Sequence, residues 1–368
     1  MYDVAVIGAG LAGLHLSRLL ASRGLRVLLA DRKASVADGV HTTGIFVRKT
    51  WEDFPLPGEQ LGAPIRHVTL YSPSRRPFHL VAGQDEFRVG RMSWLYLYLL
   101  EQCSRAGVTW MPSAEFVAFD GSALTLRRNR REQTCAVRYL AGADGARSAV
   151  ARCLSLDRNS EFLVGLEDVV ESAGGEPALH CYLHPRLAPG YIAWVVDDGS
   201  EAHVGLAGYR ERFDPAQALR TFRQSLPFAN ARTIERRGGL IPVNGILGRI
   251  ANQRGLLAGD AAGAVSPLTA GGLDAAIRLS TFAAEVIAAY LDSGDARVLA
   301  QYTGARFGAR FIARRWMRRA IATIRSPAII ELGCSMLRLQ PFRAIAEHVF
   351  FGRGSFPDAR LDPTGVTA

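Results

Sequence analysis

The sequence predicts an α/β fold with a second, antiparallel sheet and a helical C-terminal region. Three observations lead to this prediction. A buried strand at 4–7, a helix at 14–22 and a second buried strand at 25–30 form a βαβ unit. Residues 160–240 contain further strand candidates with a helix among them. Residues 296–351 then show a mostly helical and strongly basic pattern.

Composition limits the class of protein. The 368 residues include 48% hydrophobic and 21% charged residues, which is ordinary for a globular chain of two or three domains and excludes disorder as the main state. The net charge is +10, and 42 of the 44 basic residues are arginines. This excess suits an anionic cofactor, a phosphorylated substrate or an anionic membrane surface. No zinc-finger, RNA-binding or helix-turn-helix pattern is present, so we expect no nucleic-acid partner.

The cysteines and the N-terminal residues indicate the cellular compartment of the protein. The five cysteines form no CxxC pair, which favours reduced thiols and argues against a metal site. The first residues enter a strand without a basic segment, so we expect no signal peptide. No stretch reaches the ~18 apolar residues of a membrane span. We therefore expect a cytoplasmic protein, or one bound at the inner surface of a membrane.

The glycine-rich turn after the first strand has a specific physical role. Gly8 makes the tight turn, Gly10 lets the backbone approach a pyrophosphate, and Gly13 lets helix and strand pack closely. The positive end of the following helix then faces the phosphates. A carboxylate 18 residues later can accept hydrogen bonds from ribose hydroxyls. This motif does not by itself separate FAD from NAD. The candidate cofactor contacts here are Gly8, Gly10, Leu11, Ala12, Gly13, Asp31 and Arg32.

Two further motifs follow later in the chain. An Asp-Gly turn at 143–148 follows a strand, and by itself it could be any such turn. The stretch 255–273 places Asp260 after a buried strand, where it can hold a ribityl hydroxyl. It then places Gly271 and Gly272 at a helix start, whose amides can point at a flavin ring oxygen. The candidate cofactor contacts in these motifs are Asp144, Arg147, Gly259, Asp260, Pro267, Gly271, Gly272 and Leu273.

In this order, the three motifs resemble the glutathione-reductase-type FAD-binding Rossmann fold of the p-hydroxybenzoate hydroxylase class. Within that class the sequence is most similar to the geranylgeranyl reductase family, which shares the helix start at 267–273. The resemblance covers about residues 1–290 and implies FAD and an interleaved antiparallel-sheet substrate domain. The implied FAD-binding domain is 1–64, 85–158 and 240–292, the substrate domain is 65–84 and 159–239, and the helical basic C-terminal region is 293–368.

The resemblance also indicates candidate catalytic residues. The loop 40–45 stands where similar reductases carry a cysteine-rich and glycine-rich loop, and His41 or Thr42 takes the place of the cysteine. On a strand of the substrate domain, Trp194 fits a Tyr-x-Trp-x-Phe-Pro pattern. Ile192 holds the place of the tyrosine, and Tyr191 lies one residue earlier. The candidate catalytic residues are Trp194, Tyr191 and His41. The resemblance also implies cofactor contacts by Thr43 and Gly44, by Arg91 near the cofactor phosphates or ribose, and by the Val117 backbone with adenine.

Two features of the sequence bear on the electron donor and the substrate: the number of nucleotide-binding units and the composition of the substrate domain. A second strand–glycine-turn–helix unit is missing, so NAD(P)H or a reduced ferredoxin would dock transiently. The substrate domain is rich in apolar and aromatic residues and shows no anion clamp, so an apolar substrate fits best. Arginines recur every four residues at 306–318, with Ile312 and Trp316 on the other face. This resembles a basic amphipathic helix that could rest on anionic lipid, although a solvated face is the alternative.

Several functions share this fold. The first expectation is reduction of carbon–carbon double bonds of an isoprenoid-like substrate, with hydride from reduced flavin. The alternative is monooxygenation of an aromatic or polyketide molecule. Flavin halogenases need a catalytic lysine, and neither Lys33 nor Lys49 lies in such a context. A redox-silent cyclase or interaction module would show a flavin that no donor reduces.

Overall fold

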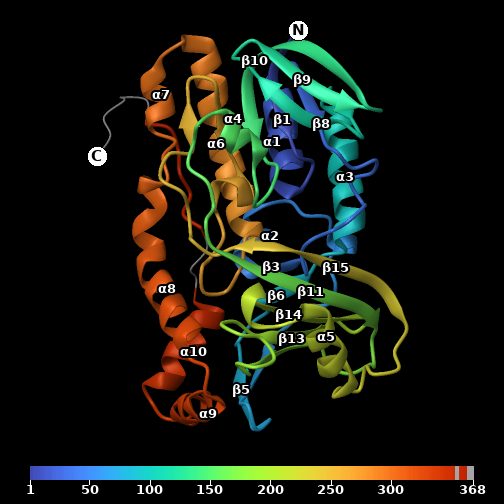
Figure 1. Cartoon of the computed structure of the whole chain (residues 1–368), viewed down its shortest axis with the longest axis vertical. Coiled ribbons are helices and arrows are strands. Elements are labelled where there is room, and N and C mark those ends of the chain that lie inside the picture. The colour runs from blue at the N-terminus through green and yellow to red at the C-terminus, as the bar shows by residue number, and fades with distance from the viewer. Residues whose placement is uncertain (353–355, 363–368) are drawn as a thin grey trace.

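Two sheets lie one beyond the other along the molecule, and helices of the C-terminal region line one side of both (Figure 1). We describe the chain from a computed structural model, which covers residues 1–352 and 356–362. The fold is the predicted mixed α/β arrangement. The remaining residues of the predicted C-terminal region, 353–355 and 363–368, lie outside the described part.

The first sheet has a parallel centre. Its order is β16-β17-β10-β1-β2-β7, and a β8–β9 hairpin extends β10. The carboxyl ends of β1, β2, β10 and β17 meet at one edge, because these strands pair in parallel. Its strands are β1 (Tyr2–Ile7), β2 (Val27–Ala30), β7 (Thr109–Met111), β8 (Glu115–Phe119), β9 (Ala123–Arg128), β10 (Arg131–Gly142), β16 (Ala251–Asn252) and β17 (Gly255–Leu257).

Burial explains why these short apolar runs become central strands. Val4 to Ile7 and Val27 to Ala30 are buried along their whole length, as strands covered on both faces must be. The long helix that closes the sheet runs from Leu273 to Ser293 and packs against the first helix. The helices of this part are α1 (Leu11–Ala21), α3 (Met92–Arg105), α4 (Ala149–Cys153) and α6 (Leu273–Ser293).

The second sheet has seven strands in the order β15-β11-β14-β13-β12-β4-β5. All its pairs are antiparallel except β12 with β4. Helix α5 (Pro215–Gln224) packs on it through buried Leu219 and Phe222. Its strands are β4 (His67–Tyr71), β5 (Pro77–Val81), β11 (Phe162–Glu171), β12 (Ala178–Tyr182), β13 (Ala193–Asp197), β14 (Glu201–Gly208) and β15 (Thr233–Pro242).

Strand β15 was not predicted. Its sequence, TIERRGGLIP, carries five consecutive charged or glycine positions in its middle and shows no regular alternation. It pairs along β11, with a register shift at Val169 and Val170. Long-range pairing therefore outweighs the weak local pattern.

Short elements connect the two sheets. The strands β3 (Ile45–Val47) and β6 (Phe87–Val89) form a small two-stranded sheet. Helix α2 (Arg48–Asp53) follows β3 directly. Among the described residues, single 3₁₀ turns are η1 (Gly58–Gln60), η2 (Arg210–Arg212) and η3 (Gly259–Ala262).

The C-terminal helices pack differently from the prediction. They are α7 (Ala296–Ala300), α8 (Ala305–Thr323), α9 (Pro327–Met336) and α10 (Phe342–Phe351). The predicted exposed arginine stripe on α8 turns inward along the helix: Arg310 is exposed, Arg314 is half-buried and Arg318 is buried. In contrast, Ile312 and Trp316 are 48% and 66% exposed. The inward face starts at buried Phe307 and Phe311, and this apolar anchor sets the helix rotation. In the described part of the chain, no helix is both long enough and apolar enough to cross a bilayer.

Candidate functional site

The glycine turn after β1 has the geometry that its sequence predicts. Gly8 has a φ of +102°, and a Cβ atom there would lie 2.2 Å from the carbonyl oxygen of Ala143. A Cβ at Gly13 would lie 1.8 Å from the carbonyl oxygen of Gly8. At Gly10 a Cβ would meet no atom within 4 Å. The turn is therefore packed behind the chain and open in front of Gly10, at the N-terminal end of α1, where Leu11 and Ala12 form the first turn.

Asp31 closes this turn from β2. One carboxylate oxygen accepts a hydrogen bond from the Ala9 amide at 2.7 Å, and the other accepts from the Lys33 amide at 2.9 Å. Each carboxylate oxygen can accept a second hydrogen bond, so these contacts leave room for a ribose hydroxyl. Arg32, next to it, is exposed.

The three motifs lie side by side. The Gly8–Ala143 contact joins the first motif to the Asp-Gly turn. A Cβ at Gly259 would come within 2.8 Å of the Ala12 Cβ, so the third motif touches the first helix. These motifs are far apart in the sequence, and the parallel pairing of β10 with β1 and β17 brings them together.

Asp260 is the clearest sign of a ligand in this region. Within the described ranges no group donates a hydrogen bond to its carboxylate, and burial raises its pKa to about 6. A Cβ at Gly272 would lie 3.4 Å from the Asp260 Oδ1 atom, so the helix start of α6 faces this carboxylate. At Gly271 a Cβ would meet only the Thr269 hydroxyl, at 3.5 Å. Asp260 is half-buried. A half-buried acceptor without a donor, next to open glycines, fits the ribityl chain and ring of FAD.

Other predicted cofactor residues have local partners. The Asp144 carboxylate accepts from the Ser148 hydroxyl and from the Ala149 and Val150 amides, which starts α4. The Arg147 guanidinium lies over the Phe162 ring at 5.8 Å. These contacts shape the Asp-Gly turn itself.

Val117 lies at a β-bulge in strand β8. The β8–β9 ladder skips this residue: Phe116 pairs with Leu126, and Ala118 pairs with Thr125. The bulge leaves the Val117 backbone groups outside that ladder. They are available for the predicted contact with adenine.

Arg91 has other partners than the expected phosphates. Its guanidinium forms ion pairs with Asp198 at 3.0 Å and Glu201 at 2.8 Å, at the β13–β14 turn. Arg91 precedes α3 of the first sheet's layer, so these ion pairs brace the two sheets against each other. The two ion pairs therefore engage the Arg91 guanidinium, which we expected to lie beside the cofactor.

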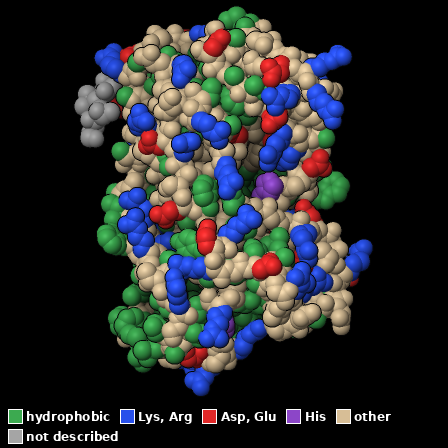
Figure 2. Space-filling view, viewed as in Figure 1, with side chains coloured by type: hydrophobic (Ala, Val, Ile, Leu, Met, Phe, Trp, Pro, Cys, Tyr) green, Lys and Arg blue, Asp and Glu red, His purple; other side chains and the backbone are tan. Residues whose placement is uncertain are grey.

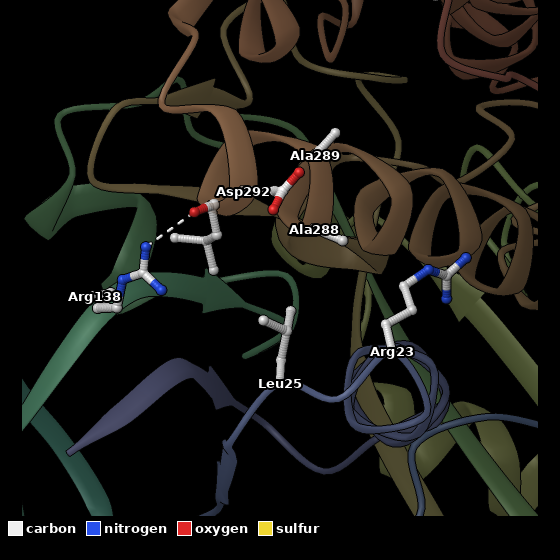
Figure 3. A pocket seen from close by; sticks show the side chains of 7 residues that line it. Arg23, Leu25, Arg138, Ala288, Ala289 and Asp292 are labelled. Atoms are coloured by element: carbon white, nitrogen blue, oxygen red, sulfur yellow. Dashed lines mark hydrogen bonds between the residues drawn. The ribbon is translucent and has the colours of Figure 1, made fainter.

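One hollow lies away from these motifs. It has a volume of about 470 Å³ and is bordered by Arg23, Leu25 and Arg138 and by the end of α6 (Figure 3). Arg138 donates to the Leu291 carbonyl at 3.0 Å across its rim. This hollow lies at the amino ends of the parallel strands, because Tyr2 pairs with Val137 there. Ligands of open α/β sheets bind at the carboxyl ends, so it is not the cofactor site.

A buried polar cluster lies on the second sheet. The Glu167 carboxylate accepts from the Thr43 hydroxyl at 2.5 Å, from the Trp194 indole at 2.9 Å and from His203 at 3.0 Å. Arg237 lies 3.9 Å away. Burial raises the pKa of Glu167, but His203, Thr43 and Arg237 outweigh it, and the pKa lies below its usual value. This cluster ties the predicted cofactor loop to the predicted catalytic strand.

Gly205 makes this cluster possible. In the sheet, Gly205 on β14 lies between Glu167 on β11 and Trp194 on β13. A Cβ at Gly205 would lie 2.4 Å from the Trp194 ring. The indole therefore lies across β14 and reaches a carboxylate two strands away.

The other two catalytic candidates lie at different places. The Tyr191 hydroxyl donates to the Thr269 carbonyl at 2.6 Å, so it joins the second sheet to the third motif. His41 is exposed and its Nδ1 atom pairs with the Gly238 carbonyl on β15 at 2.9 Å. Gly44, next in the loop, is buried against Gly90 and Met92. The three candidates thus lie at the junction of the two sheets with different hydrogen-bond partners.

Glu167 and His203 are the functional candidates that sequence reasoning missed. His203 interrupts an apolar run of β14, and Glu167 and Asp168 together interrupt the apolar pattern of β11, so the carboxylates in the middle of β11 were the available signal. The pairing of β11 with β14 could not be read from local pattern, so the partnership was not visible. The Nε2 atom of His203 is enclosed and has no hydrogen-bond partner in the described structure.

Comparison with known proteins agrees with this geometry. Residues 1–50 match the family model described as FAD binding domain. A digeranylgeranylglycerophospholipid reductase from Methanocella arvoryzae is 26% identical over 320 residues, 82% of this chain and 81% of the relative. A geranylgeranyl bacteriochlorophyll reductase-like protein from Thermoplasma acidophilum superposes with a TM-score of 0.83 at 20% identity, covering 96% and 97% of the two chains. A flavin-dependent brominase superposes with a TM-score of 0.71 at 15% identity, covering 97% and 94%.

The fold, the glycine motifs and the Asp260 environment define an FAD-dependent oxidoreductase. The brominase shows that the fold is shared across several reactions. Sequence similarity is more specific than the fold, and it relates this enzyme to the digeranylgeranylglycerophospholipid reductases. This agrees with the resemblance to the geranylgeranyl reductase family that the motifs predicted.

Proposed function

We propose that this enzyme reduces carbon–carbon double bonds of an apolar, isoprenoid-like substrate. The observation that carries the proposal is the relation to named reductases across both sheets, over 82% of the chain. When bound, reduced FAD supplies the hydride for such a reduction. The alternative, a monooxygenase, uses the same fold and is distinguished by the experiment below.

We propose that residues 1–64, 85–158 and 240–292 hold FAD, and that 65–84 and 159–239 form the substrate domain. The open space at Gly10 accommodates the pyrophosphate, Asp31 the ribose, and Asp260 the ribityl chain. The amides at Gly271 and Gly272 face the ring. The support is the packing of these motifs around one unpartnered carboxylate.

In this proposal Trp194 forms a wall of the substrate cavity and Glu167 fixes its orientation. The indole N–H donates to Glu167, so the ring cannot turn without breaking a partly buried hydrogen bond. Thr43 shares the same carboxylate, which holds the loop 41–44 against the second sheet. Tyr191 and His41 remain candidates at the edges of this junction.

The electron donor is NAD(P)H or a reduced ferredoxin in this proposal. The sequence has one glycine-turn unit, and FAD occupies it. A donor therefore docks at the surface, where the net charge of +10 attracts an anionic nucleotide or an acidic protein.

We also propose that the C-terminal helices rest on an anionic membrane. Hydrophobic side chains gather at the lower left of Figure 2, over the helices of this region. Residues 305–352 hold nine arginines and two glutamates. Apolar side chains flanked by cations are typical of helices that lie in a membrane interface. The exposed apolar residues are Ile312, Trp316, Met317, Ile329, Leu332, Met336, Leu339 and Ile345.

The test is a single-turnover experiment under nitrogen. The bound flavin is reduced, geranylgeranyl diphosphate or a prenylated lipid is added, and the absorbance of oxidised flavin is followed. Its return without oxygen supports a reductase. Return only after oxygen is admitted, with oxygen incorporated in the product, would identify a monooxygenase. The Gly10→Val variant, which lacks the cofactor space, is the blank.

A further inference from the structure

Arg318 is a buried cation without an anionic partner. It is 2% exposed and lies on α8 between the rings of Tyr191 and Tyr209, 5.3 Å from each centroid. Its Nε and Nη2 atoms are enclosed and make no hydrogen bond, and no carboxylate in residues 1–352 or 356–362 forms an ion pair with it. Burial of a charge without a partner is unfavourable, so the arrangement needs a reason.

Arg278 on α6 shows how this protein treats a buried guanidinium elsewhere. It is equally enclosed, at 4% exposed. Three carboxylates surround it, from Asp53, Asp274 and Asp358. Arg318 therefore differs from Arg278 in lacking carboxylate partners. A bound anion would supply the negative charge that Asp53, Asp274 and Asp358 supply at Arg278.

A second arginine lies one turn before Arg318 on the same helix. Arg314 is half-buried, and its Nη1 atom donates to the Ser266 hydroxyl at 3.3 Å. Burial and the nearby Arg310 lower the pKa of Arg314, which also lacks a carboxylate in the described structure. Residues four apart on a helix share a face, so the two arginine side chains leave α8 on the same side.

This pair lies beside the candidate active site. Ser266 opens the stretch that leads to Gly271, and Tyr191 donates to the Thr269 carbonyl in that same stretch. The Cβ position of Gly190 lies 3.6 Å from Ala322 Cα, so α8 packs directly on the turn before β13. The tyrosine rings hold the Arg318 plane in place, which favours two-point contact with an oxyanion.

We infer that Arg318 and Arg314 bind a phosphate or diphosphate group, the anionic head of the substrate. We expected no anion-binding group because we considered the substrate domain alone. In this inference the anion-binding arginines belong to α8, in the C-terminal region. That the phosphate belongs to the substrate rests on the proposed reductase function, whereas anion binding does not. A prenyl diphosphate and a prenylated glycerophospholipid both carry this chemistry.

The experiment uses the FAD-loaded protein and isothermal titration calorimetry. The probes are inorganic pyrophosphate and glycerol phosphate, which stand for the two heads. We expect Arg318→Met to weaken binding of the preferred probe by about tenfold or more, because a buried charge contact is lost. Arg315→Met is the matched control: it removes one charge from the exposed side of α8 and should change binding by less than about twofold.

Flavin content and thermal denaturation report whether Arg318→Met folds. Should it fail to fold, Arg314→Gln carries the same prediction from a half-buried position. Pyrophosphate should raise the Tm of the wild type more than that of the variant, because only a protein that binds the anion is stabilised by it. A variant with a lower Tm and an unchanged response to pyrophosphate would make Arg318 a purely structural cation and overturn the inference.

The remaining outcomes separate this inference from the proposed function. Absence of anion binding by the wild type at millimolar concentrations, or equal loss in Arg315→Met, overturns the anion site. Anion binding that Arg318→Met abolishes supports it, even if geranylgeranyl diphosphate fails to reoxidise the flavin, which would count against the reductase. A third outcome is that the Arg318→Met variant reduces both geranylgeranyl diphosphate and geranylgeraniol, with the ratio of their two KM values unchanged from the wild type. That result would support the reductase function and overturn the assignment of Arg318 to the phosphate head of the substrate.

Discussion

The two sheets build their sites in different ways. On the first sheet, the candidate site is formed by main-chain groups, including helix amides. Gly8 and Gly13 lie where a Cβ would clash, and the space in front of Gly10 is open. On the second sheet, the candidate site consists of side chains from three strands and from the loop that carries Thr43, gathered on Glu167. A backbone site needs particular residues at fixed spacing in one stretch of chain. A side-chain site needs strands that are distant in sequence to pair in one register.

This difference explains what could be predicted. Gly8, Gly10 and Gly13 follow a strand directly, so their role can be inferred from spacing, and the FAD-binding fold was predicted correctly. Glu167 and Trp194 meet only because Gly205 separates them across β14. No local pattern records that pairing. The rotation of α8 was likewise mispredicted, since it depends on Phe311 packing near Gly245 and Pro267.

The largest effect should come from Gly13→Val. Its Cβ would lie 1.8 Å from the Gly8 carbonyl oxygen, so α1 must move away from β1. We expect a loss of about 4 kcal/mol or more in the free energy of unfolding, comparable to severe core overpacking. Urea denaturation measures it. Gly58→Ala, where a Cβ meets nothing within 4 Å, should stay within about 1 kcal/mol of the wild type.

Gly10→Val should separate binding from folding. The new side chain enters the open space in front of the turn, so the apoprotein should keep its stability and lose FAD. The ratio of flavin to protein absorbance after purification measures the loss. A variant that purifies fully yellow would refute the assignment of this space to the cofactor.

Gly205→Ala should have the opposite selectivity. Its Cβ displaces the Trp194 ring, which breaks the hydrogen bond to Glu167. We expect FAD retention to be unchanged and turnover to fall by about 10- to 100-fold, as for misplaced active-site groups. Gly165→Ala on β11 is the control, because the tightest contact of its Cβ would be the flexible end of Ile241 at 3.3 Å, and its other neighbours lie at 3.9 Å. Equal loss of turnover in both variants would reduce Trp194 to a packing residue.

The smallest effect concerns acid stability and lies in the first sheet's layer. Burial lowers the pKa of His15 on α1 to about 3, so the native protein keeps it neutral. The unfolded chain binds a proton below its ordinary pKa of 6.5, and stability is therefore lost as pH falls through that value. Between pH 7 and pH 5 the loss should reach about 2 kcal/mol. His15→Gln should flatten this slope in urea titrations, and an unchanged slope would assign it to other groups.

The interleaving of the sheets also sets the order in which the protein can be completed during synthesis. The first sheet needs residues 2–30, 109–142 and 251–257, and the second needs 67–81 and 162–242. A nascent chain can form the glycine turn early, yet β10 waits for β17, because Leu140 pairs with Gly255. Pairing over such separations slows folding. We therefore expect cofactor loading to be a late event, since a translation product that stops before Leu257 lacks both the strand β17 and Asp260, the carboxylate that we propose for the ribityl chain.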